Sequence, residues 1–202
     1  MAIKAVDIVL LPTEVVTELA LETNRNLVDK FNSEIVLHKQ NCLPHISLAM
    51  GCVDENEIPL IEAALQSITK ECKIGQLRIK GTTISTNAKG KNVSAFEIDK
   101  TPALQNLHGH IIESMTQFFR YEATEDMIYG NEQVAETTLE WIRNYREKSS
   151  FENFWPHITI GYGQLETNIK PIQFSPAKLA VCHLGNHCTC RKVLCAVETA
   201  GL

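Results

Sequence analysis

At 202 residues, with 44% hydrophobic and 21% charged residues, the chain is long enough for one domain with a sizeable core and has an ordinary globular composition. The formal net charge of −5 argues against a protein that holds long nucleic acids by bulk electrostatics, because that mode of binding needs a basic surface. A small or terminal nucleotide remains compatible, since a local pair of donors can hold one phosphate.

The apolar start of the chain does not read as a signal peptide, because Asp7 interrupts a short run and no small-residue cleavage site follows. Nothing in the sequence approaches the roughly 18–20 uninterrupted apolar residues of a membrane span. The seven cysteines, an odd number without an export signal, are expected to be free thiols in a reducing compartment. We therefore expect a cytoplasmic protein.

Hydrophobic periodicity predicts a mixture of strands and helices. In chain order, the first part of the sequence predicts a strand at 3–11, a helix at 13–31, a strand at 43–50 and a helix that follows a capping box at Asp54 and Glu57 and ends at Gly75. The rest predicts β segments at 77–86 and 92–99, helices at 101–119 and 132–147, and strands at 155–161, 177–184 and 192–198.

The order strand, helix, strand occurs twice, first over residues 3–50 and again over residues 92–161, where a second helix is inserted. This recurrence suggests an internal duplication, with two α+β lobes facing each other across a cleft. Sequence similarity between the copies is confined to one short motif.

The closing strand of each copy carries that motif, which reads apolar-Pro-His-Ile-(Ser/Thr)-apolar at residues 43–48 and 155–160. Side chains alternate along a strand, so the histidine and the hydroxyl residue share one face while the isoleucine points to the core. The simpler alternative is a strand histidine bonded to its neighbour, which is a sound default for an isolated histidine. Because both copies match at every motif position, we favour a functional pair.

The two copies place His45 with Ser47 and His157 with Thr159. Cleavage of a phosphodiester by water needs a base for the nucleophile and an acid for the leaving oxygen, and histidine can be either near neutral pH. The two hydroxyls can donate hydrogen bonds to the non-bridging oxygens, where charge builds in the transition state. These four side chains supply what the reaction needs without a metal or a cofactor.

With these motifs, the sequence resembles the two-histidine (2H) phosphoesterase superfamily, which includes the bacterial 2′-5′ RNA ligase-like proteins and cyclic phosphodiesterases. The family signature is two copies of His-apolar-(Ser/Thr)-apolar, which residues 45–48 and 157–160 fit at all four positions. Serine in the first copy, where threonine is common, is a mild departure. The order of elements fits over most of the chain, although only the motifs are specific.

The resemblance implies an α+β, bilobal, internally duplicated fold over residues 1–202, with two antiparallel sheets flanking a central cleft and helices outside. It implies hydrolysis of a 2′,3′-cyclic phosphate or a 2′,5′ linkage at an RNA end or in a small nucleotide. His45 and His157 are then the acid–base pair, with Ser47 and Thr159 as phosphate ligands. We take His157 as the base and His45 as the acid, an order for which the sequence offers no physical reason.

Three aromatic residues near the second motif can stack on a base. Strand parity places Trp155 on the face of His157, and we count it as a candidate substrate-binding residue. The same parity places Phe154 and Tyr162 on the opposite face, where core packing is the favoured interpretation.

Other clusters carry weaker signals. The C-terminal cysteines and histidines from 182 to 195 match no standard zinc-finger or zinc-ribbon spacing. His108 and His110 lie two apart on a predicted helix and so point to different faces. The glycines near 90 and 161 lack the spacing of a nucleotide-binding loop and are interpreted as turns.

We expect a metal-independent phosphodiesterase whose partner is an RNA end or a small nucleotide, without a membrane partner and acting as a monomer. A non-catalytic nucleotide-binding module, a zinc-stabilised interaction domain and an RNA ligase running the reverse reaction remain alternatives. The sequence leaves open the natural substrate, the regiochemistry of the product, the oligomeric state and the pathway.

Overall fold

Eight strands and four α-helices form in the part of the chain that the computed structural model describes, residues 2–87, 89–166 and 168–199. The strands are β1 Ile3–Leu11, β2 Ile46–Asp54, β3 Leu77–Thr86, β4 Asn92–Ile98, β5 His157–Tyr162, β6 Ile172–Phe174, β7 Lys178–Gly185 and β8 Thr189–Glu198. The α-helices are α1 Glu14–Phe31, α2 Ile58–Glu71, α3 Pro102–Met115 and α4 Glu136–Lys148. Short 3₁₀ turns are η1 Glu55–Glu57, η2 Glu125–Met127, η3 Phe151–Asn153 and η4 Asn186–Cys188. The predicted α+β class is confirmed.

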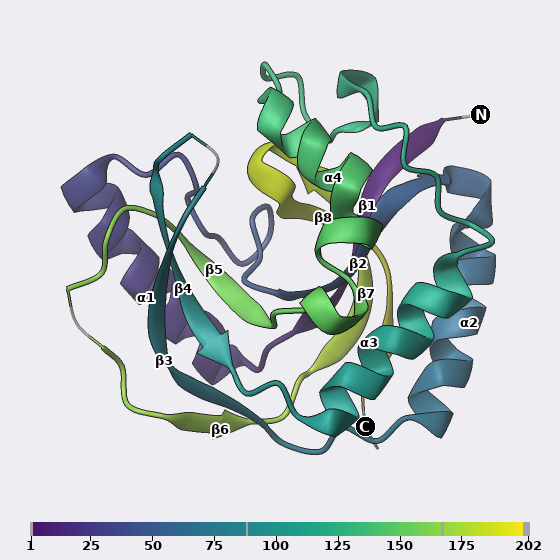
Figure 1. The fold of residues 1–202 in the computed structure, drawn as a ribbon, viewed down its shortest axis with the longest axis horizontal. Helices are drawn as coiled ribbons and strands as arrows, with labels where there is room; N and C mark the ends of the chain where they lie inside the picture. Colours follow the sequence, from purple (N-terminus) through teal and green to yellow (C-terminus); the bar gives the residue numbers. More distant parts are fainter. Residues whose placement is uncertain (1, 88, 167, 200–202) are drawn as a thin grey trace.

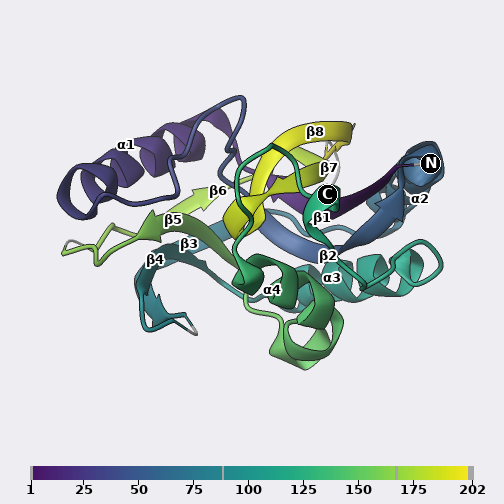
Figure 2. The ribbon, with the colours of Figure 1, turned by 90° about the horizontal axis from the view of Figure 1, so that it is seen from above.

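All the strands belong to one antiparallel sheet with the order β6-β3-β4-β5-β2-β1-β7-β8. The sheet curls about its centre, as Figures 1 and 2 show. The expectation of two separate sheets is therefore wrong. The halves are joined because β2 and β5 pair with each other at Ile46 and Ile158, which removes the open edge that each half would otherwise have.

The two predicted strand-helix-strand units are present in the structure as β1-α1-β2 and β4-α3-α4-β5. Outward from the centre of the sheet, β2, β1, β7 and β8 follow one another on one side, and β5, β4, β3 and β6 on the other. Each motif strand therefore lies beside the opening strand of its own unit. The middle of the sheet is where both motifs meet.

The helices cover the sheet through apolar contacts. α1 packs against β5, α3 and α4 pack against β2, and α2 packs against β8 and α3. Figure 2 shows α1 on one side of the sheet, with α3 and α4 on the other. One large cluster of buried apolar side chains runs through both halves, from Ile8 and Leu27 to Leu104 and Ile160. This shared core holds the two motif strands in a fixed relation.

Local signals for helix ends are confirmed in two places. The Thr101 hydroxyl accepts a hydrogen bond from the Leu104 amide at 3.1 Å, and Pro102 occupies the first helical position of α3. The capping box of Asp54 and Glu57 is also formed, although it caps η1 rather than α2 itself. Phe31, the last residue of α1, is 46% exposed.

The cysteines depart from expectation at one pair. Cys182 of β7 and Cys190 of β8 form a disulfide with Cα atoms 5.5 Å apart, so the expectation that all seven cysteines are free thiols is wrong for these two. The register of the β7–β8 hairpin brings them together, since Cys190 lies opposite Leu184, two residues beyond Cys182. The other five cysteines are free.

Among the residues that the structure describes, no helix is both long and apolar enough to cross a membrane.

Candidate active site

The two motif segments meet at the centre of the sheet. Ile46 lies directly opposite Ile158, and both side chains are fully buried in the core. Extending this antiparallel register by one residue brings His45 opposite Thr159 and Ser47 opposite His157. All four of these side chains then lie on the face away from the isoleucines, and each is only partly exposed. The structure thus brings the four sequence-predicted site residues together.

The two histidines are held in the same way. His45 Nδ1 lies 2.7 Å from the carbonyl oxygen of Leu43, and His157 Nδ1 lies 2.8 Å from the carbonyl oxygen of Trp155. A carbonyl can only accept, so Nδ1 carries the proton in each ring. The Nε2 atom of each neutral ring then keeps a lone pair. This is the tautomer that a general base needs, and it is fixed by the backbone two residues earlier.

Burial shifts both histidines toward the neutral form. It lowers the pKa of His45 from 6.5 to about 4, against an opposing effect of the hydrogen bond to Leu43, and nearby His157 lowers it further. Burial also lowers the pKa of His157 below 6.5. In the absence of substrate, both rings are therefore neutral near pH 7. A bound phosphate anion favours the protonated form of a neighbouring imidazole.

Asp7, on β1, lies directly behind the first motif. Its side chain is fully buried, and its Oδ2 atom accepts a hydrogen bond from the Ser47 hydroxyl at 2.6 Å and lies 3.7 Å from His45 Nε2. Burial raises the pKa of Asp7 well above 3.8, while the Ser47 hydroxyl and the backbone amides of Ala49 and Leu48 act in the opposite direction. In the sequence, Asp7 is visible only as a break in an apolar run.

A β-bulge follows the hydroxyl residue in each motif strand. Val9 and Ile8 of β1 lie opposite Ser47 and Ala49, so Leu48 is the extra residue of β2. In the same way Ala95 and Ser94 of β4 lie opposite Thr159 and Gly161, so Ile160 is the extra residue of β5. Each bulge shifts the alternation of side chains by one residue.

The backbone carbonyl of each bulged residue is hydrogen-bonded by a buried side chain from a helix of the other strand-helix-strand unit. His108 Nδ1, on α3, lies 2.8 Å from the Leu48 oxygen, and Asn24 Nδ2, on α1, donates to the Ile160 oxygen at 2.7 Å. The two units thus support each other's bulges. His108 Nε2 also accepts from the Phe151 amide at 2.8 Å. Rather than a ligand, His108 is a buried support, and burial lowers its pKa to about 4.

The aromatic residues divide differently from the strand-parity expectation. Trp155 is 41% exposed and stacks on His157, with ring centroids 4.2 Å apart, so it lies beside this ring as strand parity predicts. Phe154 is buried and stacks on His108, which confirms its core role. Tyr162 is partly buried and packs against the core, as expected, but the predicted face of the strand is wrong: the bulge at Ile160 returns its side chain to the face of His157, where it lines a pocket.

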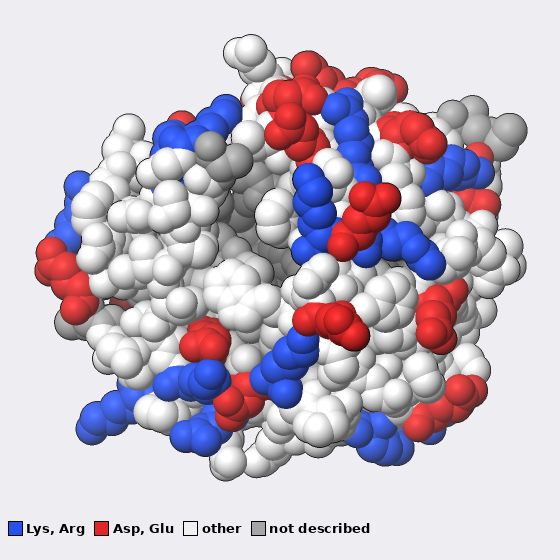
Figure 3. All heavy atoms as spheres, viewed as in Figure 1, with Lys and Arg blue, Asp and Glu red and all other residues white. Residues whose placement is uncertain are grey.

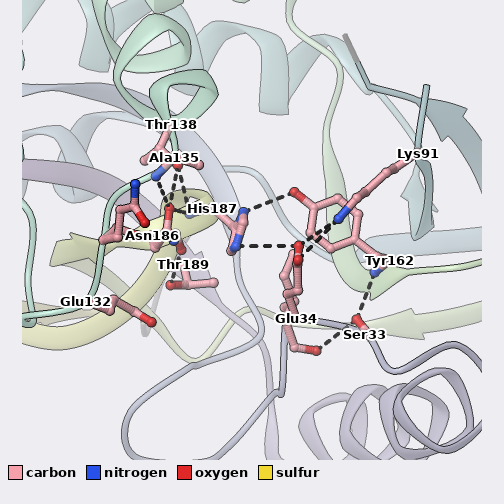
Figure 4. Close-up of polar contacts among 12 residues, drawn as sticks. Ser33, Glu34, Lys91, Glu132, Ala135, Thr138, Tyr162, Asn186, His187 and Thr189 are labelled. Carbon is pink, nitrogen blue, oxygen red and sulfur yellow. Dashed lines mark hydrogen bonds and ion pairs between the residues drawn. The ribbon is translucent and has the colours of Figure 1, made fainter. Parts of the chain in front are cut away.

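Tyr162 belongs to a polar cluster at the far end of β5 (Figure 4). Its hydroxyl lies 3.1 Å from His187 Nδ1, and Glu34 lies 3.8 Å from His187 Nε2 and 3.1 Å from Lys91. His187 has a φ of +59°, a left-handed conformation that is uncommon for a residue other than glycine. Hydrogen bonds from its amide to Thr138 and Asn186 support it in this position.

This cluster lines a pocket of about 360 Å³ between the β3–β4 turn and the segment that leads into α4. Figure 3 shows a hollow on this face of the molecule, with acidic and basic side chains interspersed around it. The surroundings of the hollow thus carry no field of one sign, which suits a small ligand better than a long polyanion.

The C-terminal residues considered as metal ligands are arranged otherwise. Cys182 and Cys190 form the disulfide, and within the described ranges no three His, Cys, Asp or Glu side chains are grouped as they would be around a metal ion. His110, considered with His108, is exposed and lies 3.2 Å from the Cys72 sulfur.

No protein-family model matches the sequence, and no curated protein sequence matches it significantly. Solved structures do match. The chain is similar to the crystal structure of TT0787 from Thermus thermophilus, with 15% identity over 98% of each chain and a TM-score of 0.57. It also matches the crystal structure of Escherichia coli LigT in its apo form, with 13% identity over 98% of each chain and a TM-score of 0.47. The likeness to TT0787 shows that the two chains share a fold.

Proposed function

We propose that the protein is a two-histidine phosphodiesterase that hydrolyses 2′,3′-cyclic phosphates or 2′,5′-phosphodiester bonds at RNA ends or in small nucleotides. The observation that carries this proposal is the matched pair of histidines: His45 and His157 lie on one face of neighbouring strands, and each has Nδ1 bonded to a backbone carbonyl. The position of both motifs at the centre of one sheet supports it, and the fold is similar to that of TT0787.

The register gives the pair a suitable spacing. His45 and His157 are diagonal neighbours across the β2–β5 pairing, for which Cα atoms lie about 7–8 Å apart and Cβ atoms somewhat closer. A phosphorus atom between the two Nε2 atoms then has a base on one side and an acid on the other. One ring takes a proton from the attacking water while the other protonates the leaving oxygen. This chemistry draws on side chains alone.

The hydroxyls complete the site. Thr159 is proposed to donate to a non-bridging oxygen, where negative charge develops in the transition state. Ser47 is proposed to do the same, but its hydroxyl already bonds to Asp7 at 2.6 Å and has to leave that carboxyl first. Thr159 is therefore the stronger phosphate ligand of the two. Trp155, exposed beside His157, is proposed to stack on a base of the substrate.

We also propose that the fold arose by internal duplication of a strand-helix-strand unit. The matching bulges at Leu48 and Ile160, and the matching side chains His108 and Asn24 that bond their carbonyls, support this. Both histidines come from one chain, and one core runs through both halves, so we propose a single domain that acts as a monomer.

The cytoplasmic location stays a prediction. Thiol titration of freshly isolated, denatured protein tests it, because Cys182 and Cys190 titrate as thiols only where the compartment keeps them reduced.

The function is tested by incubating the purified protein, in EDTA, with 2′,3′-cyclic nucleotides and with 2′,5′- and 3′,5′-linked dinucleotides. Phosphorus NMR resolves the products. Turnover of the cyclic or 2′,5′-linked substrates in EDTA is expected, with the 3′,5′-linked dinucleotides as a matched control that stays intact. Saturable binding without any product favours a non-catalytic nucleotide-binding module, and turnover that EDTA abolishes contradicts metal independence.

A further inference from the structure

Asp7 breaks the symmetry between the two halves of the site. On β1 it lies opposite Met50, three residues after Ser47. The matching position in the other half is Val93 of β4, which lies opposite Tyr162, three residues after Thr159. The backbone register, bulge included, is the same on both sides. One histidine therefore has a carboxyl behind it, while the other has an apolar side chain at the corresponding place.

The surroundings of Asp7 supply hydrogen-bond donors from Ser47 and from the backbone of Ala49 and Leu48, but no permanent cation. It is fully buried, and among the described residues the one basic side chain within 4.0 Å is His45, with Oδ2 and Nε2 3.7 Å apart, a contact that becomes an ion pair only when the ring is protonated. Its Oδ1 atom has no hydrogen-bond partner in the described part of the chain. A buried carboxylate without a cation raises the free energy of the folded state, so such a group either holds a proton or shares one with a nearby base.

The other titratable groups near Asp7 do not take up that proton. Tyr145 on α4 and Cys188 on η4 both interact with it, but burial raises the pKa of each, so both stay neutral. Ser47 is a hydroxyl that donates to Oδ2. His157 faces His45 from β5 and lies on the other half of the site. His45 is thus the base that Asp7 can share a proton with.

We propose that Asp7 is a positioning residue that shares one proton with His45 and thereby makes His45 the proton donor of the reaction, leaving His157 as the base. This inference rests on the proposed phosphodiesterase function. It supplies a physical reason for the order of acid and base that the sequence does not provide.

The protons balance over one turnover. In the resting enzyme the shared proton lies on the carboxyl, and it moves to His45 Nε2 when a phosphate anion binds beside the ring. His157 Nε2 takes a proton from water as the water oxygen bonds to phosphorus. The bond from phosphorus to the leaving oxygen breaks as that oxygen takes the Nε2 proton of His45. The proton on His157 then returns through solvent to Asp7, and the enzyme regains its starting state.

The arrangement also assigns the hydroxyls. While His45 is charged, Asp7 is a carboxylate, and the Ser47 hydroxyl remains bonded to it. Ser47 then holds the carboxylate in place beside the imidazolium, and in this state it is not the phosphate donor considered above, because its one proton cannot serve both acceptors. In the half of the site that holds Thr159, Val93 occupies the place that matches Asp7, and Glu97, opposite His157, is partly exposed and paired with Lys80. Thr159 is therefore the hydroxyl that bonds to the phosphate in this state.

The first test does not depend on turnover. Protein labelled with ¹³C and ¹⁵N is titrated by NMR, following the Asp7 carboxyl carbon and the ring nitrogens of His45 and His157. In the wild type, Asp7 and His45 are expected to report the same two apparent pKa values, because coupled groups titrate as a pair. In Asp7→Asn, His45 is expected to titrate about one pH unit lower or more, with His157 unchanged. Independent titrations in the wild type, or an unchanged His45 in the variant, overturn the inference.

The second test compares leaving groups. An alkoxide needs a proton as it leaves, whereas p-nitrophenolate is a stable anion and does not. Asp7→Asn is expected to lose about 10²-fold or more in kcat on a nucleotide ester with an alkoxide leaving group, and less than about tenfold on the corresponding p-nitrophenyl ester. His157→Ala is expected to lose activity on both. Equal losses on both esters in Asp7→Asn contradict the assignment of His45 as the acid.

Ser47→Ala is the matched variant, since it removes the hydroxyl and keeps the carboxyl. It is expected to leave the His45 titration in place, and a shift equal to that of Asp7→Asn would mean that Asp7 acts only by orienting Ser47. The two proposals fail in different ways. A coupled titration in a protein without turnover on any ester leaves the Asp7–His45 pair standing and contradicts the phosphodiesterase function. Turnover with uncoupled titrations leaves the phosphodiesterase function standing and contradicts the Asp7–His45 pair.

Discussion

Ile46 and Ile158 face each other at the one residue pair through which β2 joins β5 in the described part of the chain, and both are fully buried. This pair makes one sheet of the two halves and fixes the register of the residues on either side. The two histidines are therefore positioned by core packing rather than by loops. A site built on packed strands is held to a narrow range of geometries, as acid–base catalysis requires.

The pH dependence of the proposed reaction follows from the environment of His157, the proposed base. Burial lowers the pKa of His157 below 6.5, so the ring stays neutral, and active as a base, into more acidic solution than an exposed histidine. The acidic limb of kcat/KM is expected to have its midpoint below pH 6.5, measured on the free enzyme with the preferred substrate. A midpoint at or above that value contradicts the assignment of a buried base.

Replacing Asp7 is expected to stabilise the folded protein and to lower its activity. Burial raises the pKa of Asp7 in the folded state, so the folded protein binds a proton that the unfolded chain has released above pH 3.8, and stability falls as the pH rises above that value. Asn does not titrate. At about pH 7, Asp7→Asn is expected to gain on the order of 1–3 kcal/mol in the free energy of unfolding. Urea denaturation measures this.

The pH provides the control for that gain. Below pH 3.8 the carboxyl is protonated in both states, so the difference between Asp7→Asn and the wild type is expected to disappear there. A gain that is equal at about pH 3 and about pH 7, or a loss at the higher pH, would show that the buried carboxyl is not the source.

The support for the bulge in β2 is tested at His108. His108→Ala leaves the Leu48 carbonyl and the Phe151 amide without their partner and removes the stack on Phe154. The expected loss is about 2–4 kcal/mol in the free energy of unfolding. His110→Ala, an exposed histidine on the same helix, is the matched control and is expected to change stability by less than about 0.5 kcal/mol. Similar losses in both variants refute the bulge-support role.

Substrate stacking is tested at Trp155, which is exposed and lies beside His157. Base stacking on an aromatic side chain contributes about 1–3 kcal/mol, so Trp155→Ala is expected to raise KM by roughly 5- to 150-fold. Trp155→Phe keeps a ring and is expected to recover most of that loss. Steady-state kinetics on a dinucleotide separate the two parameters. A wild-type KM in Trp155→Ala would show that the nucleobase of the substrate does not stack on Trp155.

Much of the fold could be predicted from the sequence because its periodic elements are long. The β3 and β4 strands and the start of α3 at Thr101-Pro102 were identified by patterns that depend on near neighbours alone. The joining of two expected sheets into one could not be predicted, because it depends on a single contact between Ile46 and Ile158, which lie far apart in the sequence.

The site shows the same division. Strand alternation places His45 and Ser47 together correctly, because no irregularity separates them. It fails for Tyr162, because the bulge at Ile160 adds a residue that the sequence pattern does not reveal. Asp7 carried a usable signal, since an acidic residue between apolar residues of a strand is a candidate for a buried carboxyl group. Its relation to His45 depends on the pairing of β1 with β2 and is visible only in the structure.

The central claim is that His45 and His157 act together on one phosphate. Its most direct measurement is kcat for His45→Ala, His157→Ala and the double variant on the preferred substrate, with His38→Ala, an exposed histidine outside the motifs, as the control. Each single variant is expected to lose about 10²–10⁴-fold, and the double variant little more than the larger single loss, while His38→Ala stays at the wild-type rate. Wild-type turnover in either single variant would contradict the account.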